Sequence, residues 1–335
     1  MKSTKLKAPL FCINEKCEHY KNPIGRWFVF KGYYRTKHNH KYIQRYQCKV
    51  CRFKFSENTF RDTYRQHKPH INKHIFNWYC SGATLRRMAK NLKITRGTAV
   101  RKFRFLAKKS RMIHACELIT GNLDTGEVHF DEQETFMHTK QMPLSIAIAV
   151  DGKHNALGGK IIDIDVAMMP ARGRNAKLSQ ARFGILPDER PYVCQTVLNN
   201  VGIATGGRII LQTDAKPAYR TYVERILPMA IHRAISKAER ERQPSRHEDK
   251  RVPLWWGDQA CASIRHDLSR MRRRTCVTTK DIHGLRQHLW LYTAHRNGYQ
   301  RDLFDPWFKN TKFRQLKASY SSGVYGERAT KFLNR

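Results

Sequence analysis

Two pairs of closely spaced cysteines constrain the fold of this chain more than any other feature. Cys12 and Cys17 form the first pair, and Cys48 and Cys51 follow about thirty residues later. Each short loop can turn two thiolates toward one metal ion, and four thiolates about 2.3 Å from Zn²⁺ make a tetrahedral site. The pattern predicts a zinc ribbon over residues 1–57, in which these four cysteines bind one structural zinc ion.

Two alternatives to a four-cysteine site remain open. A histidine, His19, His38 or His40, can replace one thiolate as a ligand, and two disulfides can replace the metal. Nine cysteines, an odd number, and the lack of a secretory segment favour a reducing cytoplasm, where disulfides are rare. The other cysteines are interpreted as buried small hydrophobic residues: Cys80, Cys116, Cys194, Cys261 and Cys276.

The charge of the chain indicates the class of its partner. It has 64 Lys and Arg residues against 27 Asp and Glu residues, which gives a net charge of +37. Such a chain favours a polyanion bound through phosphate contacts. No apolar run approaches the roughly 18 residues of a membrane span, so nucleic acid is favoured over a membrane. Neither a phosphate-binding P-loop nor a dinucleotide glycine motif is present, which disfavours ATP-driven and redox chemistry.

Helical periodicity follows the predicted ribbon. Apolar residues at helical spacing from residue 70 to residue 104 predict three helices, with a tight turn in the segment 81–103 and Thr95 as an N-cap. This layout predicts a helix-turn-helix domain over residues 58–118. A plain helical hairpin with a solvated charged face is the alternative. The residues predicted to face the major groove are Arg96, Arg101, Lys102 and Arg104.

The period changes to that of strands after residue 124. Three successive strands, a helix and a further strand predict a mixed α/β domain over residues 124–297. Asp163 and Asp165 alternate with apolar residues and are predicted on the solvent face of their strand. An exposed insert near residues 237–250, two helices over 255–273 and 281–296, and a basic aromatic tail over 298–335 complete the predicted organisation.

Two acids stand next to apolar strands in a chain that has few acids. Asp131 follows Val128–Phe130, and Asp214 closes the strand 208–213. An ionised carboxylate in such a place costs several kcal/mol unless a cation compensates it. Two metal ions held by carboxylates about 3.5–4 Å apart are one compensation, and they would support phosphoryl-transfer chemistry. A turn former, or for Asp214 a cap of the helix after Pro217, is the alternative role.

The motifs together resemble a family of mobile-element enzymes. Tyr46–Phe55, the helix-turn-helix, Asp131–Phe136 and Thr213–Tyr219 are similar to bacterial insertion-sequence transposases of the insertion sequence one group and its relatives. The stretch Ile264–Lys280 is similar to the family's catalytic helix, and Leu289–Tyr292 with His295–Asn297 is similar to the helix after it. The resemblance covers roughly residues 10 to 297. It implies an RNase H-like catalytic domain with a triad of acidic metal ligands.

The resemblance implies roles for individual residues. Asp131 and Asp214 would be the first and second ligands of Mg²⁺ or Mn²⁺. The third would be Asp258, which lies seven residues before Arg265; two helical turns put both on one face, the acid toward metal and the arginine toward DNA phosphate. The family has Glu, or Asn in some relatives, at this position, so the shorter Asp departs from its pattern.

Other roles for these segments stay open. Asp267 and Glu248 are alternative third ligands, and Asp258 is alternatively an acid that favours a helix N-terminus. The cationic cluster expected to hold the DNA backbone comprises Arg270, Arg272, Arg273 and Arg274.

The resulting expectation is a DNA transposase that binds the terminal inverted repeats of its element. It would cleave and join strands with two Mg²⁺ or Mn²⁺ ions, act as a homo-oligomer on double-stranded DNA, and reside in the bacterial cytoplasm at the nucleoid. One rival is a catalytically inactive DNA-binding protein or repressor derived from a transposase. The other is an RNA-binding or processing factor, since a zinc ribbon and a basic surface suit either nucleic acid.

Overall fold

The computed structural model describes residues 8–35, 42–120, 125–152, 159–241, 253–272 and 277–315. These residues form two compact units. One contains the residues up to His70 together with those from Asp305 onward, and the other runs from Ile71 to Phe304. The segments predicted as the helix-turn-helix and the α/β domain therefore lie in a single compact unit.

The first unit is built around a small antiparallel sheet. Strands β1 (Phe28–Arg35), β2 (Tyr42–Cys48) and β3 (Lys54–Ser56) pair in that order, and the short helix α1 (Glu18–Lys21) lies between the first two cysteines and β1. Aromatic rings fill its core, with Trp27 and Phe55 stacked at 5.9 Å between ring centroids. Residues 305–315 of the predicted tail belong to this unit, where Trp307 stacks on Phe60 and Arg314 lies over the ring of Phe11.

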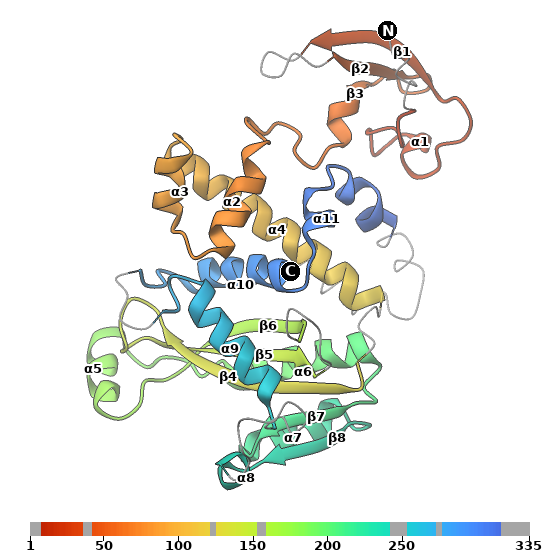
Figure 1. The fold of residues 1–335 in the computed structure, drawn as a ribbon. Coiled ribbons are helices and arrows are strands. Elements are labelled where there is room, and N and C mark those ends of the chain that lie inside the picture. The colour runs from red at the N-terminus through yellow and green to blue at the C-terminus, as the bar shows by residue number, and fades with distance from the viewer. Residues whose placement is uncertain are drawn as a thin grey trace. The chain divides into compact units, whose positions relative to one another are not determined.

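A five-stranded sheet forms the centre of the second unit (Figure 1). Its spatial order is β6, β5, β4, β7, β8; β5 runs antiparallel to both of its neighbours, while β7 pairs parallel with β4 and with β8. Strands β4, β6, β7 and β8 consequently run in one direction. The strands are β4 (Glu127–Phe136), β5 (Pro143–Asp151), β6 (Ile161–Met168), β7 (Ile210–Asp214) and β8 (Ile231–Ile235).

Helices cover this sheet and confirm the predicted mixed α/β class. A core of apolar side chains joins the sheet to α6 and α7, while α9 packs against β4 and β5. Gln133 on β4 donates a hydrogen bond of 3.2 Å to the carbonyl of Cys261 on α9. The helices are α5 (Arg174–Phe183), α6 (Arg190–Thr205), α7 (Pro217–Ile226), α8 (Lys237–Glu241), α9 (Trp255–Asp267), α10 (Ile282–Arg296) and α11 (Gln300–Phe304).

The three helices predicted ahead of the sheet are present. They are α2 (Ile71–Cys80), α3 (Leu85–Asn91) and α4 (Arg96–Thr120). Thr95 caps the last of them as predicted, because its hydroxyl accepts a hydrogen bond of 3.2 Å from the backbone N–H of Thr98. Helix α4 is 25 residues long and packs along α10, so its second half belongs to the framework of the α/β sheet. None of the helices among the described residues is long and apolar enough to span a membrane.

The predicted solvent position of Asp163 is wrong. Its side chain is only 3% exposed and lies 3.4 Å from the guanidinium of Arg111, 3.8 Å from His114 and 2.5 Å from the amide of Asn200. Alternation along β6 suggested an open face, but α6 and α10 pack against this strand, and α4 reaches it through Arg111 and His114. Burial alone would raise the pKa of Asp163, yet these partners hold it below its usual value.

Replacement of Asp163 by alanine is expected to destabilise the protein by about 3–5 kcal/mol, because it removes the counter-charge of the partly buried Arg111 and the hydrogen-bond partner of the buried Asn200. The matched variant Asp165→Ala removes an acid that is 28% exposed and paired with Arg286, and it should lose less than about 1 kcal/mol. Urea unfolding of both variants measures the difference. Since the pKa is lowered in the folded state, the contribution of Asp163 is present near neutral pH and disappears as the pH falls through that value.

Candidate metal centres and acidic site

The four predicted cysteines meet at one point. The sulfur atoms of Cys12 and Cys51 are 3.5 Å apart, and those of Cys17 and Cys48 are 3.8 Å apart. Four sulfurs placed tetrahedrally about 2.3 Å from one metal ion are separated by roughly 3.8 Å. The spacing therefore fits one Zn²⁺, and the four thiols are free rather than joined in disulfides. The predicted cysteine cluster is confirmed and can bind one zinc ion.

The surroundings shift the pKa values of these thiols in opposite directions, and burial raises those of Cys12 and Cys17. Burial tends to raise the pKa of the Cys51 thiol, but the backbone of Phe53 and the adjoining thiols lower it to about 7. His19 is not part of the cluster; its ring lies 5.7 Å from that of Trp27. The alternative ligands His38 and His40, as well as Cys276, lie outside the described residues. The remaining cysteines of the described part of the chain are buried as predicted: Cys80, Cys116, Cys194 and Cys261.

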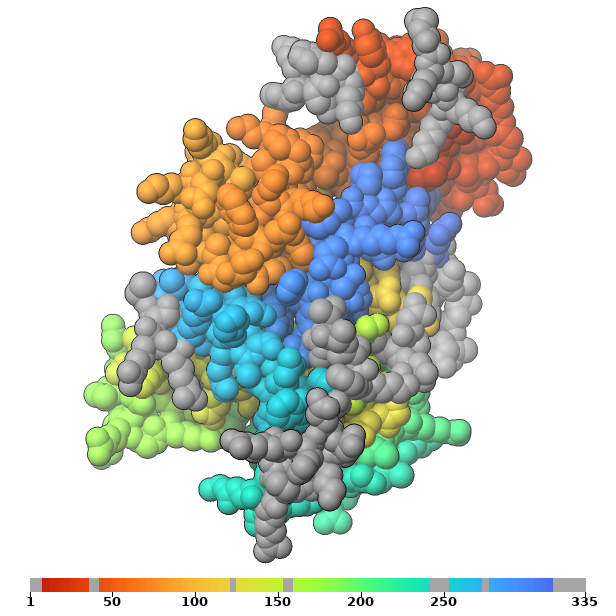
Figure 2. Space-filling view, viewed as in Figure 1, coloured from red at the N-terminus to blue at the C-terminus, as the bar shows by residue number. Residues whose placement is uncertain are grey.

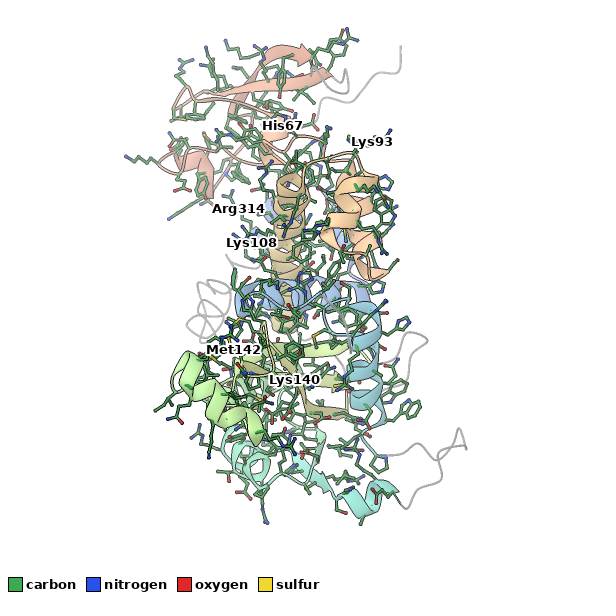
Figure 3. The ribbon with its side chains drawn as sticks, turned by 90° about the vertical axis from the view of Figure 1, so that its left-hand side faces the viewer. His67, Lys93, Lys108, Lys140, Met142 and Arg314 are labelled. Atoms are coloured by element: carbon green, nitrogen blue, oxygen red, sulfur yellow. The ribbon has the colours of Figure 1, made fainter. Side chains whose placement is uncertain are left out.

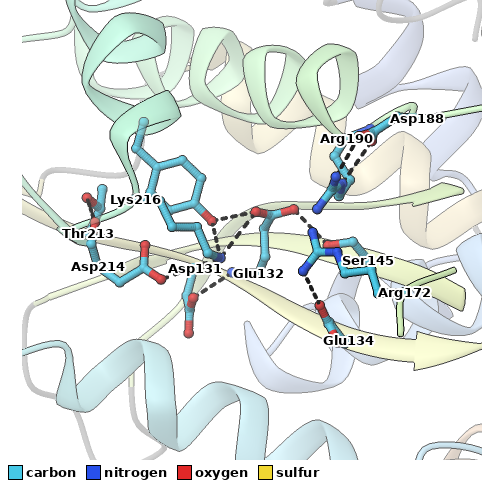
Figure 4. A network of polar contacts seen from close by, with 11 residues as sticks. Asp131, Glu132, Glu134, Ser145, Arg172, Asp188, Arg190, Thr213, Asp214 and Lys216 are labelled. Carbon is cyan, nitrogen blue, oxygen red and sulfur yellow. Dashed lines mark hydrogen bonds and ion pairs between the residues drawn. The ribbon is translucent and has the colours of Figure 1, made fainter. Parts of the chain in front are cut away.

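Asp131 and Asp214 are brought together by the pairing of β4 with β7. The last registered pair of these parallel strands is Phe130 with Thr213, and each acid is the next residue of its strand. Figure 4 shows the two carboxylates near each other. Burial, together with the charges of Asp214 and Asp258, raises the pKa of Asp131 to about 6. The carboxylates thus repel one another in a partly buried place, which a cation would relieve.

One carboxylate oxygen of Asp214 also favours a bound cation at this place. Its Oδ2 lies 3.4 Å from the ammonium of Lys216, but its Oδ1 is buried and has no hydrogen-bond partner among the described residues. A buried acceptor without a partner is costly, and carboxylate oxygens are the ligands that Mg²⁺ prefers. The donor set of Asp131 and Asp214 therefore fits a hard divalent cation.

Asp258 lies near the other two acids but is held differently. It stands in the first turn of α9, its side chain is 47% exposed, and its carboxylate forms a 2.5 Å ion pair with Arg240 of α8. The hydrogen bond to Asp258, with smaller contributions from the charges of Asp131 and Asp214, raises the pKa of Arg240. Within the part of the chain that the structure describes, only the cysteines bring three or more metal-binding side chains within 4.8 Å of one another.

Sequence analysis missed a polar network on the other side of β4. Glu132 follows Asp131 and points away from it, as alternation along a strand requires (Figure 4). Its carboxylate accepts hydrogen bonds from Tyr219 at 2.7 Å and Ser145 at 2.8 Å, and Lys216 approaches it at 3.3 Å. Lys216 thereby joins Glu132 to Asp214. The sequence signal that could have revealed this network is the short segment from Asp214 to Tyr219, which contains both Lys216 and Tyr219, the partners of Glu132.

The predicted DNA-contact residues of the helices are only partly on the surface. Arg96, Arg101 and Arg104 are exposed on α4. Lys102 is 5% exposed, and burial lowers the pKa of its ammonium to about 8, so it does not share their exposed face. Lys102 is the neighbour of Arg101 and lies about 100° from it around the helix, which turns its side chain away from the exposed face.

The residues predicted to contact DNA around α9 also differ in their exposure to solvent. Arg265 is partly exposed, Arg272 is exposed and donates a hydrogen bond to the carbonyl of His266, and Arg270 is partly buried with its pKa lowered by burial. Asp267 pairs with His266 at 2.9 Å. Arg273, Arg274 and Glu248 lie outside the described residues.

Replacing Asp131 by asparagine should stabilise the protein, increasingly so at higher pH. The raised pKa means that the folded state holds this proton more tightly than the unfolded chain, so the wild type loses stability as the pH rises through about 6. Asparagine removes that loss, and its advantage should grow by roughly 1 kcal/mol between pH 5 and pH 8. Thermal unfolding without added divalent ions measures it; an advantage independent of pH would contradict the assignment.

Comparisons with known proteins give no family assignment: no protein-family model matches the chain, and a search of the curated proteins finds no match.

Proposed function

We propose that the protein is a DNA transposase that cleaves and joins DNA strands at the acidic site of its α/β sheet. The observation that carries the proposal is the juxtaposition of Asp131 and Asp214 on neighbouring parallel strands, with a raised pKa on the first and a buried unpartnered oxygen on the second. A carboxylate pair of this kind is suited to divalent metal ions, and a chain of net charge +37 is suited to a polyanionic substrate.

The fold of the second unit also supports the proposed transposase function. The order β6, β5, β4, β7, β8, with three antiparallel strands followed by two parallel ones, agrees with an RNase H-like domain. Helix α9 crosses this sheet at β4 and β5 and carries Asp258 toward the acids, as the resemblance to insertion-sequence transposases implies. The cysteine cluster and the helices α2 to α4 would serve as the ribbon and helix-turn-helix that bind the terminal inverted repeats.

Each residue of the proposed site would have a separate role. Asp131 and Asp214 would hold Mg²⁺ or Mn²⁺, and Asp258 would join them once its pair with Arg240 opens. Bound metal supplies an activated attacking oxygen and neutralises charge on the leaving oxygen. Lys216, fixed by Glu132 and Tyr219, keeps a positive charge beside Asp214 and steadies that carboxylate. The need to hold two element ends together favours a homo-oligomer on DNA.

One observation favours the second candidate, a DNA-binding repressor without catalytic activity. Asp258 is already neutralised by Arg240 and is one methylene shorter than the family's Glu. A protein of this kind would bind the same DNA and leave it intact.

The test is direct. Full-length protein is incubated with a labelled duplex that carries the gene's flanking sequence, with and without Mg²⁺ or Mn²⁺. Metal-dependent nicking supports the transposase, whereas tight binding without cleavage under any of these conditions supports the repressor. Preference for RNA over duplex DNA in competition would reject both.

Arg240→Gln should reduce the metal concentration that the site requires. The guanidinium competes with a divalent cation for Asp258, and an exposed ion pair of this kind is worth about 0.2–1 kcal/mol, so half-maximal Mn²⁺ binding should shift by about 1.4- to fivefold to lower concentration. Arg225→Gln, an exposed arginine at the end of α7, is the matched control. Titration with Mn²⁺ followed by electron paramagnetic resonance measures both. Weaker metal binding by Arg240→Gln would show that this arginine supports the site.

A further inference from the structure

The segment after β6 lies at the same edge of the sheet as the acidic site. Strands β4, β6 and β7 run in one direction, so the end of β6 at Met168 and the end of β7 at Asp214 face the same way. In open α/β sheets, ligands bind at the carboxyl ends of the parallel strands. The side chains of α5 and α9 are both visible on the face shown in Figure 2.

A cleft of about 290 Å³ opens between the end of β4 and the start of α5. Lys140, in the turn between β4 and β5 (Figure 3), and Arg172, just before α5, supply its two cations. Glu134 is the sole acid among the described residues that line it, and its carboxylate lies 3.7 Å from Arg172. Both members of that pair are more than 60% exposed, so Arg172 is available to another anion.

Helix α5 extends this basic surface. The sequence contains no acid between Met169 and Pro187, and the charged side chains of the helix are exposed on its surface: Arg174, Lys177 and Arg182. Glu134 lies three residues beyond Asp131 on β4, a rise of roughly 10 Å along the strand. Alternation along the strand places Glu134 on the face of Glu132 rather than on that of Asp131, so a duplex that contacts both the cleft and the acids reaches round this edge of the sheet.

We propose that this cleft and the exposed side of α5 hold the phosphate backbone of duplex DNA next to the bond that is cut. The inference rests on the proposed function and adds the surface that positions the substrate. Phosphate contacts from Arg and Lys fix the register of a protein on a duplex and carry no sequence preference. This surface would accordingly hold DNA of any sequence, in contrast to the helix-turn-helix.

The test uses full-length protein with Lys140→Ala/Arg172→Ala. The matched control is Lys160→Ala/Arg208→Ala, which removes the same two residue types just before β6 and β7, at the opposite edge of the sheet. Affinity for the flanking-sequence duplex and for an unrelated duplex is measured by fluorescence anisotropy across 50–300 mM salt. Each lost phosphate contact should reduce the slope of log affinity against log salt by about 0.9, so the first variant should lose about 1.8 on both duplexes and the control should lose nothing.

A second variant, Glu134→Gln, distinguishes the loss of phosphate contacts from a failure to fold. Removing the acid of the cleft should tighten binding at low salt, which damage to the fold would not produce. Unchanged affinity and slope in the Lys140/Arg172 variant, or an equal loss in the control, would overturn the inference. If the wild type nicks DNA while that variant binds normally, only the inference fails; if the wild type binds without nicking yet the slopes change as expected, the surface stands and the catalytic proposal fails.

Discussion

Alanine at Asp131 or at Asp214 will lower metal-dependent nicking by about a thousandfold or more while duplex binding persists. Each carboxylate would be a direct ligand of the reactive metal, and loss of such a ligand removes several kcal/mol of transition-state stabilisation, each 1.36 kcal/mol being a factor of ten. The pairing of the two strands fixes both acids, so neither has a substitute at its position. Nicking of end-labelled duplex in Mg²⁺ and in Mn²⁺ measures the loss, with anisotropy on the same preparations to report binding.

The matched control for these variants is Glu224→Gln. Glu224 is an exposed acid on α7 that pairs with Arg220. Its replacement removes one negative charge from the same unit without changing the acidic site. Retained nicking in either aspartate variant would remove that residue from the proposed site. Asp258→Ala decides a narrower question: if it alone remains active, the third ligand is another acid and the pair with Arg240 is structural.

Removal of zinc will unfold the first unit. Its core consists of a three-stranded sheet and a set of aromatic side chains, too small to be stable without help, while structural zinc sites contribute about 10–16 kcal/mol of binding free energy. Cys48→Ser or a strong chelator should bring the zinc content from one per chain to near zero. Limited proteolysis should then cut within residues 8–70 while the fragment from Ile71 to Phe304 persists.

Cys80→Ala provides the control for the zinc experiment. Cys80 is a buried free thiol on α2, outside the cluster, so its loss should leave the zinc content at one per chain. Zinc loss without any change in proteolysis would mean that the metal is not what stabilises this unit.

Sequence patterns succeeded where the information is local. The spacing of the four cysteines predicts the cluster because two tight loops suffice to bring pairs of thiols together, and Thr95 is recognisable as a cap because its hydroxyl bonds within its own turn. The proximity of Asp131 and Asp214 was partly accessible, since each follows a run of apolar residues. Asp131 lies inside β4 rather than at its end, however, so the register of β4 with β7, which the sequence does not give, brings the two acids together.

The errors and omissions arise from contacts between distant segments. Asp163 looks solvent-exposed on an alternating strand, but α4, α6 and α10 enclose it, and nothing in β6 itself encodes that enclosure. The partners of Glu132 and Asp258 come from α7 and α8, at separations that no local period reports. Burial of Lys102 follows from the packing of α4 on its neighbours.

The length of α4 has a consequence for where a transposase of this build would cut. The helix begins with exposed Arg96 and, more than three turns later, anchors Arg111 and His114 against Asp163 in the sheet that holds the acids. One continuous helix, about 37 Å long at 1.5 Å per residue, thus leaves no flexible linker between the end proposed to read DNA and the catalytic framework. The rigid helix would hold these two parts at a fixed distance. The number of base pairs between the recognised sequence and the cleaved bond would then be the same at every element end.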